Sequence, residues 1–215
     1  MYCYPNNPTG ATMNRPELAA VAEFCRDHDL AVLSDEIYAD LTYEGEHVSI
    51  AEFEGMRERT VVFNGFSKTY AMTGLRLGYA MGPSEVVTAM NRVHQYTMLS
   101  APTTAQHAAI EALRNCRPDV EEMRAQYDRR RTFVLSRLEE MGIDCFEATG
   151  AFYVFPACPS GDAEQFAEDL LEAERVAMVP GTAFGAGAAG HLRASYATGL
   201  DELKSAMDRL ERFVA

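Results

Sequence analysis

The order of hydrophobic and polar positions predicts alternating helices and strands in the first half of the chain. Asn14 suits a helix N-cap, Glu17 completes a capping box, and apolar residues follow at helical spacing to about His28. Short runs rich in β-forming residues predict buried strands at residues 30–33, 60–63 and 77–81. This alternation favours an α/β fold with a mainly parallel sheet.

The pattern changes after Pro83. Helical spacing predicts helices at residues 84–95, 103–114 and 118–141, of which the last is long and heavily charged. Beyond Gly142, strands near residues 151–155 and 192–197 alternate with helices at residues 162–174 and 200–214. We therefore expect residues 1–120 to form part of a large sheet domain, and residues 121–215 to form an interdomain helix and a small α+β domain.

Polar clusters follow three of the predicted strands. Residues 2–4 lead into a Pro-Asn-Asn-Pro-Thr-Gly block, residues 30–33 into Ser34, Asp35 and Glu36, and residues 60–63 into a segment that ends at Lys68. The carboxyl ends of parallel strands share one edge of a sheet, and ligands bind beyond that edge. The three strand ends are thus expected to converge on one site.

Composition and charge narrow the class of protein. The chain has 215 residues, 47% of them hydrophobic and 24% charged, as in an ordinary globular protein. Thirty-two acidic residues against 19 basic ones give a formal net charge of -13, which disfavours nucleic acid as a partner. No run approaches the roughly 18 apolar residues of a membrane helix, and residues 1–5 lack a signal-peptide pattern. We expect a cytoplasmic protein without a membrane partner.

The cysteines and histidines predict no metal site. Five cysteines without a C-x-x-C pair suit reduced thiols rather than a disulfide set or a zinc site. The five histidines have no metal-ligand spacing. Any catalytic chemistry is therefore expected to come from other side chains.

Lys68 is the first candidate for such chemistry. A lysine in a partly desolvated pocket can lose its proton and form an imine with a carbonyl compound. Arg76, eight positions later, carries planar donors that suit a phosphate. Taken alone, a lysine at a strand end is more often a solvated side chain, so the surrounding groups decide the interpretation.

Those groups match the needs of pyridoxal phosphate. This cofactor requires an imine-forming amine, an anion near the pyridine nitrogen, a donor to the ring hydroxyl and a phosphate clamp. Asp35 could keep the ring nitrogen protonated, and Tyr38 with Asn7 could hydrogen-bond the phenolic oxygen. With Lys68 and Arg76, the sequence offers a candidate for every role.

Four sequence blocks carry a family resemblance. They are Tyr4-Pro5-Asn6-Asn7-Pro8-Thr9-Gly10, Ser34-Asp35-Glu36-Ile37-Tyr38, the stretch from Gly65 to Gly78, and Leu192-Arg193-Ala194-Ser195-Tyr196-Ala197. In type and order they resemble the fold-type I pyridoxal-phosphate enzymes, specifically the class I/II aminotransferases related to aspartate aminotransferase. The resemblance implies part of a large, mainly parallel-sheet domain with helices on both faces that binds the cofactor, followed by a smaller α+β domain.

The resemblance also implies residue roles. Lys68 is implied to be the Schiff-base lysine and the base that moves the proton of the substrate Cα, and Asp35 to be the partner of the ring nitrogen. Arg193 corresponds to the arginine that grips the substrate α-carboxylate, and Asn7 is also implied to bind the substrate. The further implied contacts, to the ring oxygen and the phosphate, are made by Asn7, Tyr38, Ser67 and Arg76.

Two departures from the family pattern bear on cofactor binding. Gly65 stands where relatives often have a phosphate-binding serine. Relatives also carry a long N-terminal portion with a glycine-containing phosphate loop, a ring-stacking aromatic residue and a tyrosine that reaches the partner subunit. The sequence here starts at the strand before the first block. We therefore expect weak cofactor binding by this chain alone, an exposed apolar sheet surface, and a homodimer in the full-length form.

The expected activity is amino transfer between an L-amino acid and a 2-oxo acid. A pyridoxal-phosphate lyase of the same fold and a truncated, non-catalytic remnant are the alternatives. The run from Gly185 to Gly190 satisfies G-x-G-x-x-G, but it lacks the strand before and the helix after that a dinucleotide site requires, so we expect a flexible loop. Glu36 and Asp40 are interpreted as structural or solvated.

Overall fold

The computed structural model describes residues 1–215 as two compact units. The first unit comprises Met1–Pro5 and Thr12–Met123, and the second comprises Asn6–Ala11 and Arg124–Ala215. The short segment Asn6–Ala11 therefore belongs to the second unit, although the chain on either side of it belongs to the first.

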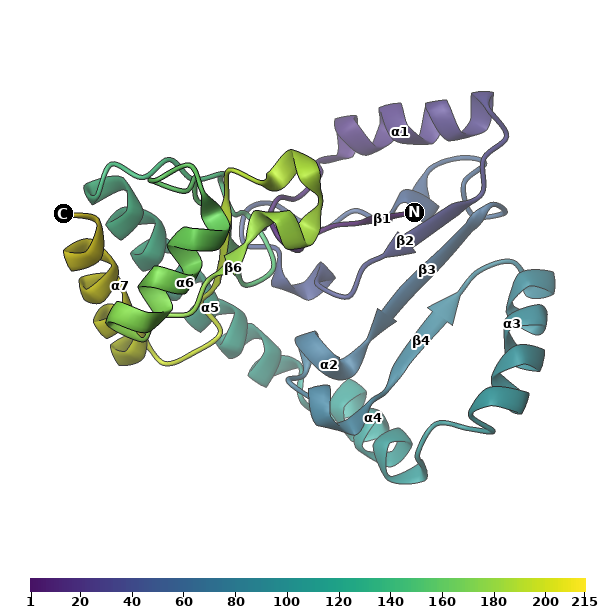
Figure 1. Ribbon diagram of the computed structural model, residues 1–215. Coiled ribbons are helices and arrows are strands. Elements are labelled where there is room, and N and C mark those ends of the chain that lie inside the picture. Colours follow the sequence, from purple (N-terminus) through teal and green to yellow (C-terminus); the bar gives the residue numbers. More distant parts are fainter. The chain divides into compact units, whose positions relative to one another are not determined.

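The first unit is built around a four-stranded sheet (Figure 1). Its elements are β1 (Tyr2–Cys3), α1 (Arg15–Asp27), β2 (Val32–Asp35), β3 (Thr60–Gly65), α2 (Phe66–Thr69), β4 (Gly78–Met81), α3 (Ser84–Thr97), α4 (Thr103–Asn115) and the start of α5 (Arg117–Glu140).

The sheet order is β1-β2-β3-β4, in which the first three strands are parallel and β4 is antiparallel. Asp35 pairs with Cys3 on one side and with Phe63 on the other, so the carboxyl ends of β1, β2 and β3 lie at one edge, as expected. The predicted strand at residues 30–33 is wrong in its bounds, since β2 is Val32–Asp35. The prediction assumed a strand buried on both faces. In β2 burial alternates instead, since Val32 and Ser34 are buried and Leu33 is exposed, so only one face of the strand is buried.

Helix α1 begins at the predicted capping box. The Asn14 side-chain oxygen accepts from the Glu17 N–H at 3.0 Å, and a Glu17 carboxylate oxygen accepts from the Asn14 N–H at 2.7 Å. The buried face of α1 packs on the sheet and on the segment after β2. This core consists of Leu18, Ala22, Cys25, Val32, Ile50 and Met56.

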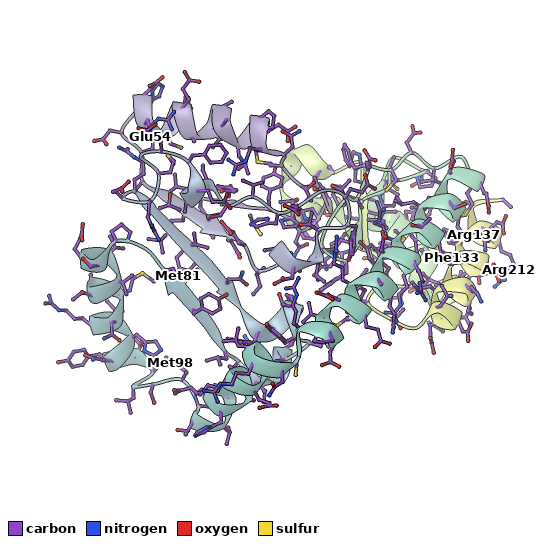
Figure 2. All side chains as sticks on the ribbon, turned by 180° about the vertical axis from the view of Figure 1, so that it is seen from behind. Glu54, Met81, Met98, Phe133, Arg137 and Arg212 are labelled. Atoms are coloured by element: carbon purple, nitrogen blue, oxygen red, sulfur yellow. The ribbon has the colours of Figure 1, made fainter.

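An apolar surface of the first unit is exposed. Tyr79 and Met81 of β4 are exposed to 42% and 54%, and α3 buries none of its residues. Met98, at the end of α3, is also exposed (Figure 2). The expected exposed apolar surface on the sheet unit is thus confirmed. None of the helices is both long and apolar enough to cross a membrane.

The second unit contains a three-stranded antiparallel sheet in the order β5-β7-β6. Besides most of α5, its elements are β5 (Tyr153–Val154), α6 (Ala163–Glu174), β6 (Val179–Pro180), β7 (Leu192–Ser195) and α7 (Leu200–Val214). The strands predicted at residues 151–155 and 192–197 are longer than the observed β5 and β7. Strand β6 was not predicted, because two residues ending in proline carry no alternation to detect.

Charged side chains link helices within the second unit. Arg137 of α5 donates to Asp208 at 2.8 Å and to Glu211 at 2.9 Å, both on α7, and Arg212 of α7 pairs with Glu174 at 2.8 Å. Figure 2 shows Arg137 and Arg212 at this end of the chain. These pairs hold α7 against α5 and α6.

Candidate functional site

Lys68 lies in the short helix α2, directly after strand β3. The helix is anchored by Phe66, which is buried against Ala109 and Ala112 of α4. Lys68 itself is partly buried, and its Nζ lies 5.8 Å from the centre of the Tyr38 ring. An amine in such surroundings keeps less of its hydration shell than a surface lysine. The structure thus brings together two of the candidate residues, Lys68 and Tyr38.

Asp35 is the last residue of β2 and lies beside β3, the strand that leads to Lys68. Its side chain is partly buried, and its Oδ1 accepts a hydrogen bond of 3.2 Å from the Ile37 N–H. Three residues later, Tyr38 is 5% exposed. A carboxylate, a phenol and an amine therefore come from the ends of two neighbouring strands.

Arg76 is exposed and has a left-handed backbone, with φ of 55°. Its Nη1 donates to the Thr73 carbonyl at 2.8 Å, and the Thr73 hydroxyl donates to the Ser67 carbonyl at 2.7 Å. Two consecutive hydrogen bonds thus connect Arg76 to the helix of Lys68. Ser67 and Arg76 were predicted from the sequence as cofactor-binding residues. Thr73, which joins them, was given no role.

The structure explains why residue 65 is a glycine. Gly65 pairs with Gly78 across β3 and β4, and a Cβ at residue 65 would lie 2.9 Å from Gly78 Cα and 3.0 Å from the Leu77 carbonyl oxygen. Both are backbone atoms, so any side chain would require the two strands to move apart. Glycine at residue 65, where relatives often have serine, therefore goes together with the close approach of β3 and β4.

Asp40 connects the segment after β2 to the helix of Lys68. The Thr69 hydroxyl donates to Asp40 Oδ2 at 3.1 Å, and Arg117 Nη1 donates to Asp40 Oδ1 at 2.6 Å. The hydrogen bonds to Asp40 and Glu121 raise the pKa of Arg117 above its ordinary value. The structural interpretation of Asp40 is confirmed, and its partner Thr69 is the residue next to Lys68.

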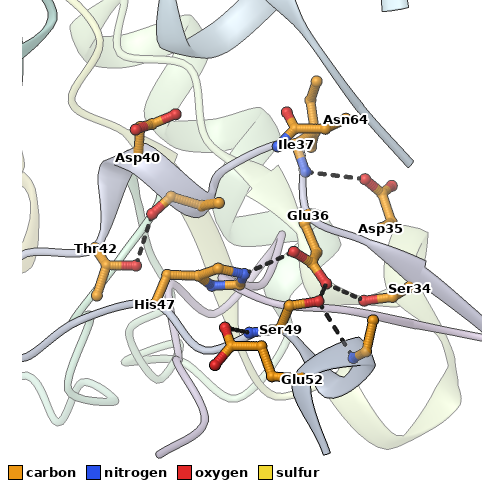
Figure 3. Close-up of polar contacts among 12 residues, drawn as sticks. Ser34, Asp35, Glu36, Ile37, Asp40, Thr42, His47, Ser49, Glu52 and Asn64 are labelled. Atoms are coloured by element: carbon orange, nitrogen blue, oxygen red, sulfur yellow. Dashed lines mark hydrogen bonds and ion pairs between the residues drawn. The ribbon is translucent and has the colours of Figure 1, made fainter. Parts of the chain in front are cut away.

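Glu36 is the centre of a buried polar cluster (Figure 3). Its Oε1 accepts from the hydroxyls of Ser34 at 2.8 Å and Ser49 at 2.7 Å, and its Oε2 lies 2.9 Å from His47 Nε2. We call Ser34, Glu36, His47 and Ser49 the Glu36 network. Burial raises the pKa of Glu36, but the hydrogen bonds from His47, Ser49 and Ser34 outweigh burial and hold that pKa below its ordinary value.

Arg193 and Asn7 meet in the second unit. Arg193 Nη1 donates to the Asn7 side-chain oxygen at 2.9 Å. The guanidinium carbon lies 4.7 Å from the centre of the Tyr153 ring and 4.9 Å from that of the Phe184 ring. Two aromatic contacts and one hydrogen bond thus hold the guanidinium. Tyr153 and Phe184 were not identified from the sequence.

The loop that carries Asn7 is held by its own hydrogen bonds. The Asn6 side-chain oxygen accepts from the Thr9 N–H at 3.2 Å and from the Thr9 hydroxyl at 2.8 Å. The Gly10 carbonyl accepts from the Gly150 N–H at 2.8 Å, which fastens the loop to the second unit. The Asn7–Pro8 peptide bond is cis, as the resemblance permits, and so is Tyr4–Pro5.

The structure divides the candidate residues between the two units. The first unit holds five of the six candidates for the cofactor, namely Asp35, Tyr38, Ser67, Lys68 and Arg76, whereas the second holds the sixth, Asn7, together with Arg193. A cavity of about 380 Å³ in the second unit, lined by residues of α5, β5, β7 and α7, contains none of them. The run from Gly185 to Gly190 forms a loop with a short 3₁₀ turn at Ala186–Ala188 and opens no helix, which excludes a dinucleotide site of the Rossmann type there.

The family model described as aminotransferase class I and II matches residues 1–210. The chain belongs to this family. Class I and II aminotransferases depend on pyridoxal 5'-phosphate, so this is the cofactor that the family assigns. The four blocks identified in the sequence all lie within the matched residues.

Individual members of the family match all or nearly all of the chain. A Bacillus subtilis protein, YugH, is 50% identical over 216 residues, which are 100% of this chain and 56% of that protein. Aromatic-amino-acid aminotransferase 2 of Thermococcus litoralis is 46% identical over 213 residues, 97% of this chain and 55% of its own length. The chain thus spans about half the length of the curated relatives it matches.

Solved structures of the family share the fold. Aspartate aminotransferase from Thermus thermophilus with maleate has a TM-score of 0.93 and is 43% identical, covering 100% of this chain and 56% of that one. An aromatic aminotransferase from Pyrococcus horikoshii has a TM-score of 0.95 at 45% identity. The fold-type I, mainly parallel α/β architecture expected from the sequence is therefore confirmed.

Proposed function

We propose that the protein containing this chain is a pyridoxal-phosphate-dependent aminotransferase that moves an amino group between an L-amino acid and a 2-oxo acid. The observation that carries the proposal is the position of Lys68 Nζ, 5.8 Å from the centre of the Tyr38 ring. Lys68 follows β3, and Asp35 ends the neighbouring β2. The proposal is supported by the family match over residues 1–210.

The donor set of the first unit fits this cofactor. An aldehyde requires an amine, which Lys68 supplies, and a pyridinium nitrogen requires an anion, which Asp35 supplies. The Tyr38 hydroxyl suits the phenolic oxygen, and the exposed guanidinium of Arg76, with Ser67 nearby, suits the phosphate. When bound, the cofactor supplies an electron sink for the negative charge that develops at the substrate Cα.

Each residue then has a defined task. Lys68 Nζ would hold the cofactor, and its free amine would move a proton between the substrate Cα and the C4' carbon of the cofactor. Asp35 keeps a proton on the ring nitrogen by stabilising the positive charge there. Tyr38 donates to the ring oxygen from a buried position, where a hydrogen bond competes little with water.

In the second unit, we assign the α-carboxylate of the substrate to Arg193. A guanidinium binds a carboxylate through two parallel N–H donors, and this fixes the orientation of the substrate as well as its charge. Asn7 takes one N–H of Arg193, and Tyr153 and Phe184 contact the guanidinium faces. These contacts orient the guanidinium of Arg193 before the substrate binds.

Three broader proposals follow from membership of the family. We propose that the first unit corresponds to part of the large cofactor-binding domain and the second to the interdomain helix and small domain. We further propose that the complete protein is a homodimer that acts in the cytoplasm. The five cysteines are free thiols, and two of them, Cys25 and Cys158, are buried, which suits a reducing compartment.

The test compares Lys68→Arg with Lys204→Arg in the complete gene product loaded with pyridoxal phosphate. These are the two lysines of this chain, and Lys204 is an exposed residue of α7. We expect glutamate formation that requires both an L-amino acid and 2-oxoglutarate, is lost in Lys68→Arg and is retained in Lys204→Arg. Equal activity in the two variants would contradict the proposal. Release of ammonia without glutamate formation would indicate a lyase instead.

A further inference from the structure

Glu36 is a buried carboxylate that the proposed reaction does not use. A carboxylate removed from water is stabilised only when charged or polar partners replace the lost hydration. Glu36, 5% exposed, has three such partners in Ser34, His47 and Ser49. Apolar residues at this position would cost less desolvation free energy. Stability alone therefore does not explain the network.

The position of the network along the strand supplies that explanation. Side chains alternate between the two faces of a strand, so Ser34 and Glu36 share one face and Asp35 occupies the other. Figure 3 shows the carboxylate of Asp35 directed away from the network, while Ser34 and Glu36 are hydrogen-bonded to each other. Asp35 is therefore held between two anchored neighbours.

The backbone around Asp35 is fixed by the same residues. The Glu36 N–H donates to the Phe63 carbonyl at 2.8 Å, which extends the pairing with β3 one residue beyond Asp35. On the other side of Glu36, the Ile37 N–H donates to Asp35 Oδ1 at 3.2 Å. A shift of Glu36 would consequently move both the main chain of Asp35 and the donor that orients its carboxylate.

The far side of the network is attached to the hydrophobic core. Ser49 accepts at 3.3 Å from the Ala51 N–H and caps the 3₁₀ turn Ile50–Glu52, and Ile50 is fully buried beneath α1. Through Ser49, the Glu36 network thus connects the end of β2 to the rigid hydrophobic core.

We propose that Glu36, held by His47, Ser34 and Ser49, is a positioning residue that directs the carboxylate of Asp35 toward the cofactor ring. This inference rests on the proposed function. Its physical basis is that a catalytic group must be held in its productive geometry, and small displacements of such a group reduce the rate strongly.

The experiment compares Glu36→Ala with Glu36→Gln in the complete gene product. Alanine removes the network, whereas glutamine keeps an oxygen acceptor for the serine hydroxyls and a polar group toward His47. Glu23→Ala, on the exposed face of α1, is the matched control. Ser49→Ala removes one of the three partners and provides a milder variant if Glu36→Ala does not fold.

Two readouts separate positioning from a general loss of stability. Amide hydrogen exchange of Ile37, measured without cofactor, reports on the bond to Asp35, and we expect it to rise about tenfold or more in Glu36→Ala and less in Ser49→Ala. With cofactor bound, we expect kcat in Glu36→Ala to fall about a hundredfold, with little change in KM and a shifted absorption band. Glu36→Gln should recover most of both effects, and Glu23→Ala should match the unmodified protein.

The two proposals fail in different ways. Unchanged Ile37 exchange in Glu36→Ala and Ser49→Ala would overturn the positioning role, and so would an equal loss of kcat in Glu23→Ala or in Glu36→Gln. The proposed function fails instead if Lys68→Arg leaves the absorption of bound cofactor unchanged, whatever the exchange rate of Ile37.

Discussion

Arg193 donates a hydrogen bond of 2.9 Å to the side-chain oxygen of Asn7, a residue 186 positions earlier in the chain. Both residues belong to the second unit, because Asn7 lies in the segment Asn6–Ala11. A guanidinium has five N–H donors, and this bond uses one of them. The Asn-Pro-Thr-Gly block therefore presents an acceptor that orients the arginine rather than neutralising it.

Removing that acceptor should weaken substrate binding. A hydrogen bond to a charged group contributes about 1.5–3 kcal/mol, so we expect Asn7→Ala to raise KM for the amino acid about 10- to 100-fold. Asn115→Ala, which alters an exposed residue of α4, is the control and should leave KM unchanged. Steady-state kinetics with a fixed 2-oxo acid measure the effect. An unaltered KM in Asn7→Ala would show that the bond to Arg193 does not serve substrate binding.

The aromatic contacts of Arg193 should also contribute. A cation–π contact of a partly desolvated arginine is worth about 0.5–2 kcal/mol, so we expect Phe184→Leu to raise KM about 2- to 30-fold. Phe146→Leu alters a half-exposed ring that stacks on Phe155 and His191 instead, and should have no such effect. If both leucine variants raise KM equally, the contact with Arg193 is not the cause.

Gly10 and Gly45 form a matched pair for testing how the loop of Asn7 is built. Both have positive φ, at 72° and 73°, but a Cβ at Gly10 would lie 2.7 Å from Ala148 Cβ and from the Tyr153 carbonyl oxygen, whereas Gly45 has open space. We expect Gly45→Ala to lower the free energy of unfolding by about 1–2 kcal/mol, and Gly10→Ala by about 2–5 kcal/mol. Urea unfolding measures both values. Equal losses would contradict tight packing around Gly10.

The low pKa of Glu36 predicts that the free energy of unfolding decreases as the pH falls through the acidic range. In the folded protein this pKa lies below the ordinary value of 4.5, so the unfolded chain binds the proton more readily. The stabilisation is complete above pH 4.5 and is lost as the pH falls through the folded pKa. Glu36→Gln does not titrate, so its free energy of unfolding should fall less steeply below about pH 4.5. Urea unfolding over this range measures both slopes. Identical slopes for Glu36→Gln and the unmodified protein would refute the assignment.

Features encoded over a few neighbouring residues could be predicted from the sequence. The capping box of Asn14 and Glu17 needs only a spacing of three, and the order of strands and helices follows from periodicity. The bounds of β2 were wrong because a short apolar run looks the same whether one face or both faces are buried, and Leu33 turned out to be exposed.

Contacts between distant residues could not be predicted in the same way. Glu36 carries no sign of its partners His47 and Ser49, which are 11 and 13 residues away and have no periodic relation to it. Nothing in the sequence marks Tyr153 and Phe184 as neighbours of Arg193, because aromatic residues near a strand are usually part of a core. Such pairs become visible only when the fold brings them together.

The central claim is that Lys68 holds the cofactor, and chemical labelling tests it most directly. Sodium borohydride converts the bond between a lysine and pyridoxal into a stable amine, so reduction of the loaded complete gene product followed by peptide mapping identifies the lysine. We expect the pyridoxyl group on Lys68 and none on Lys204, the other lysine of this chain. A label on Lys204 or on a lysine outside this chain, or no label at all on a protein that binds the cofactor, would contradict the claim.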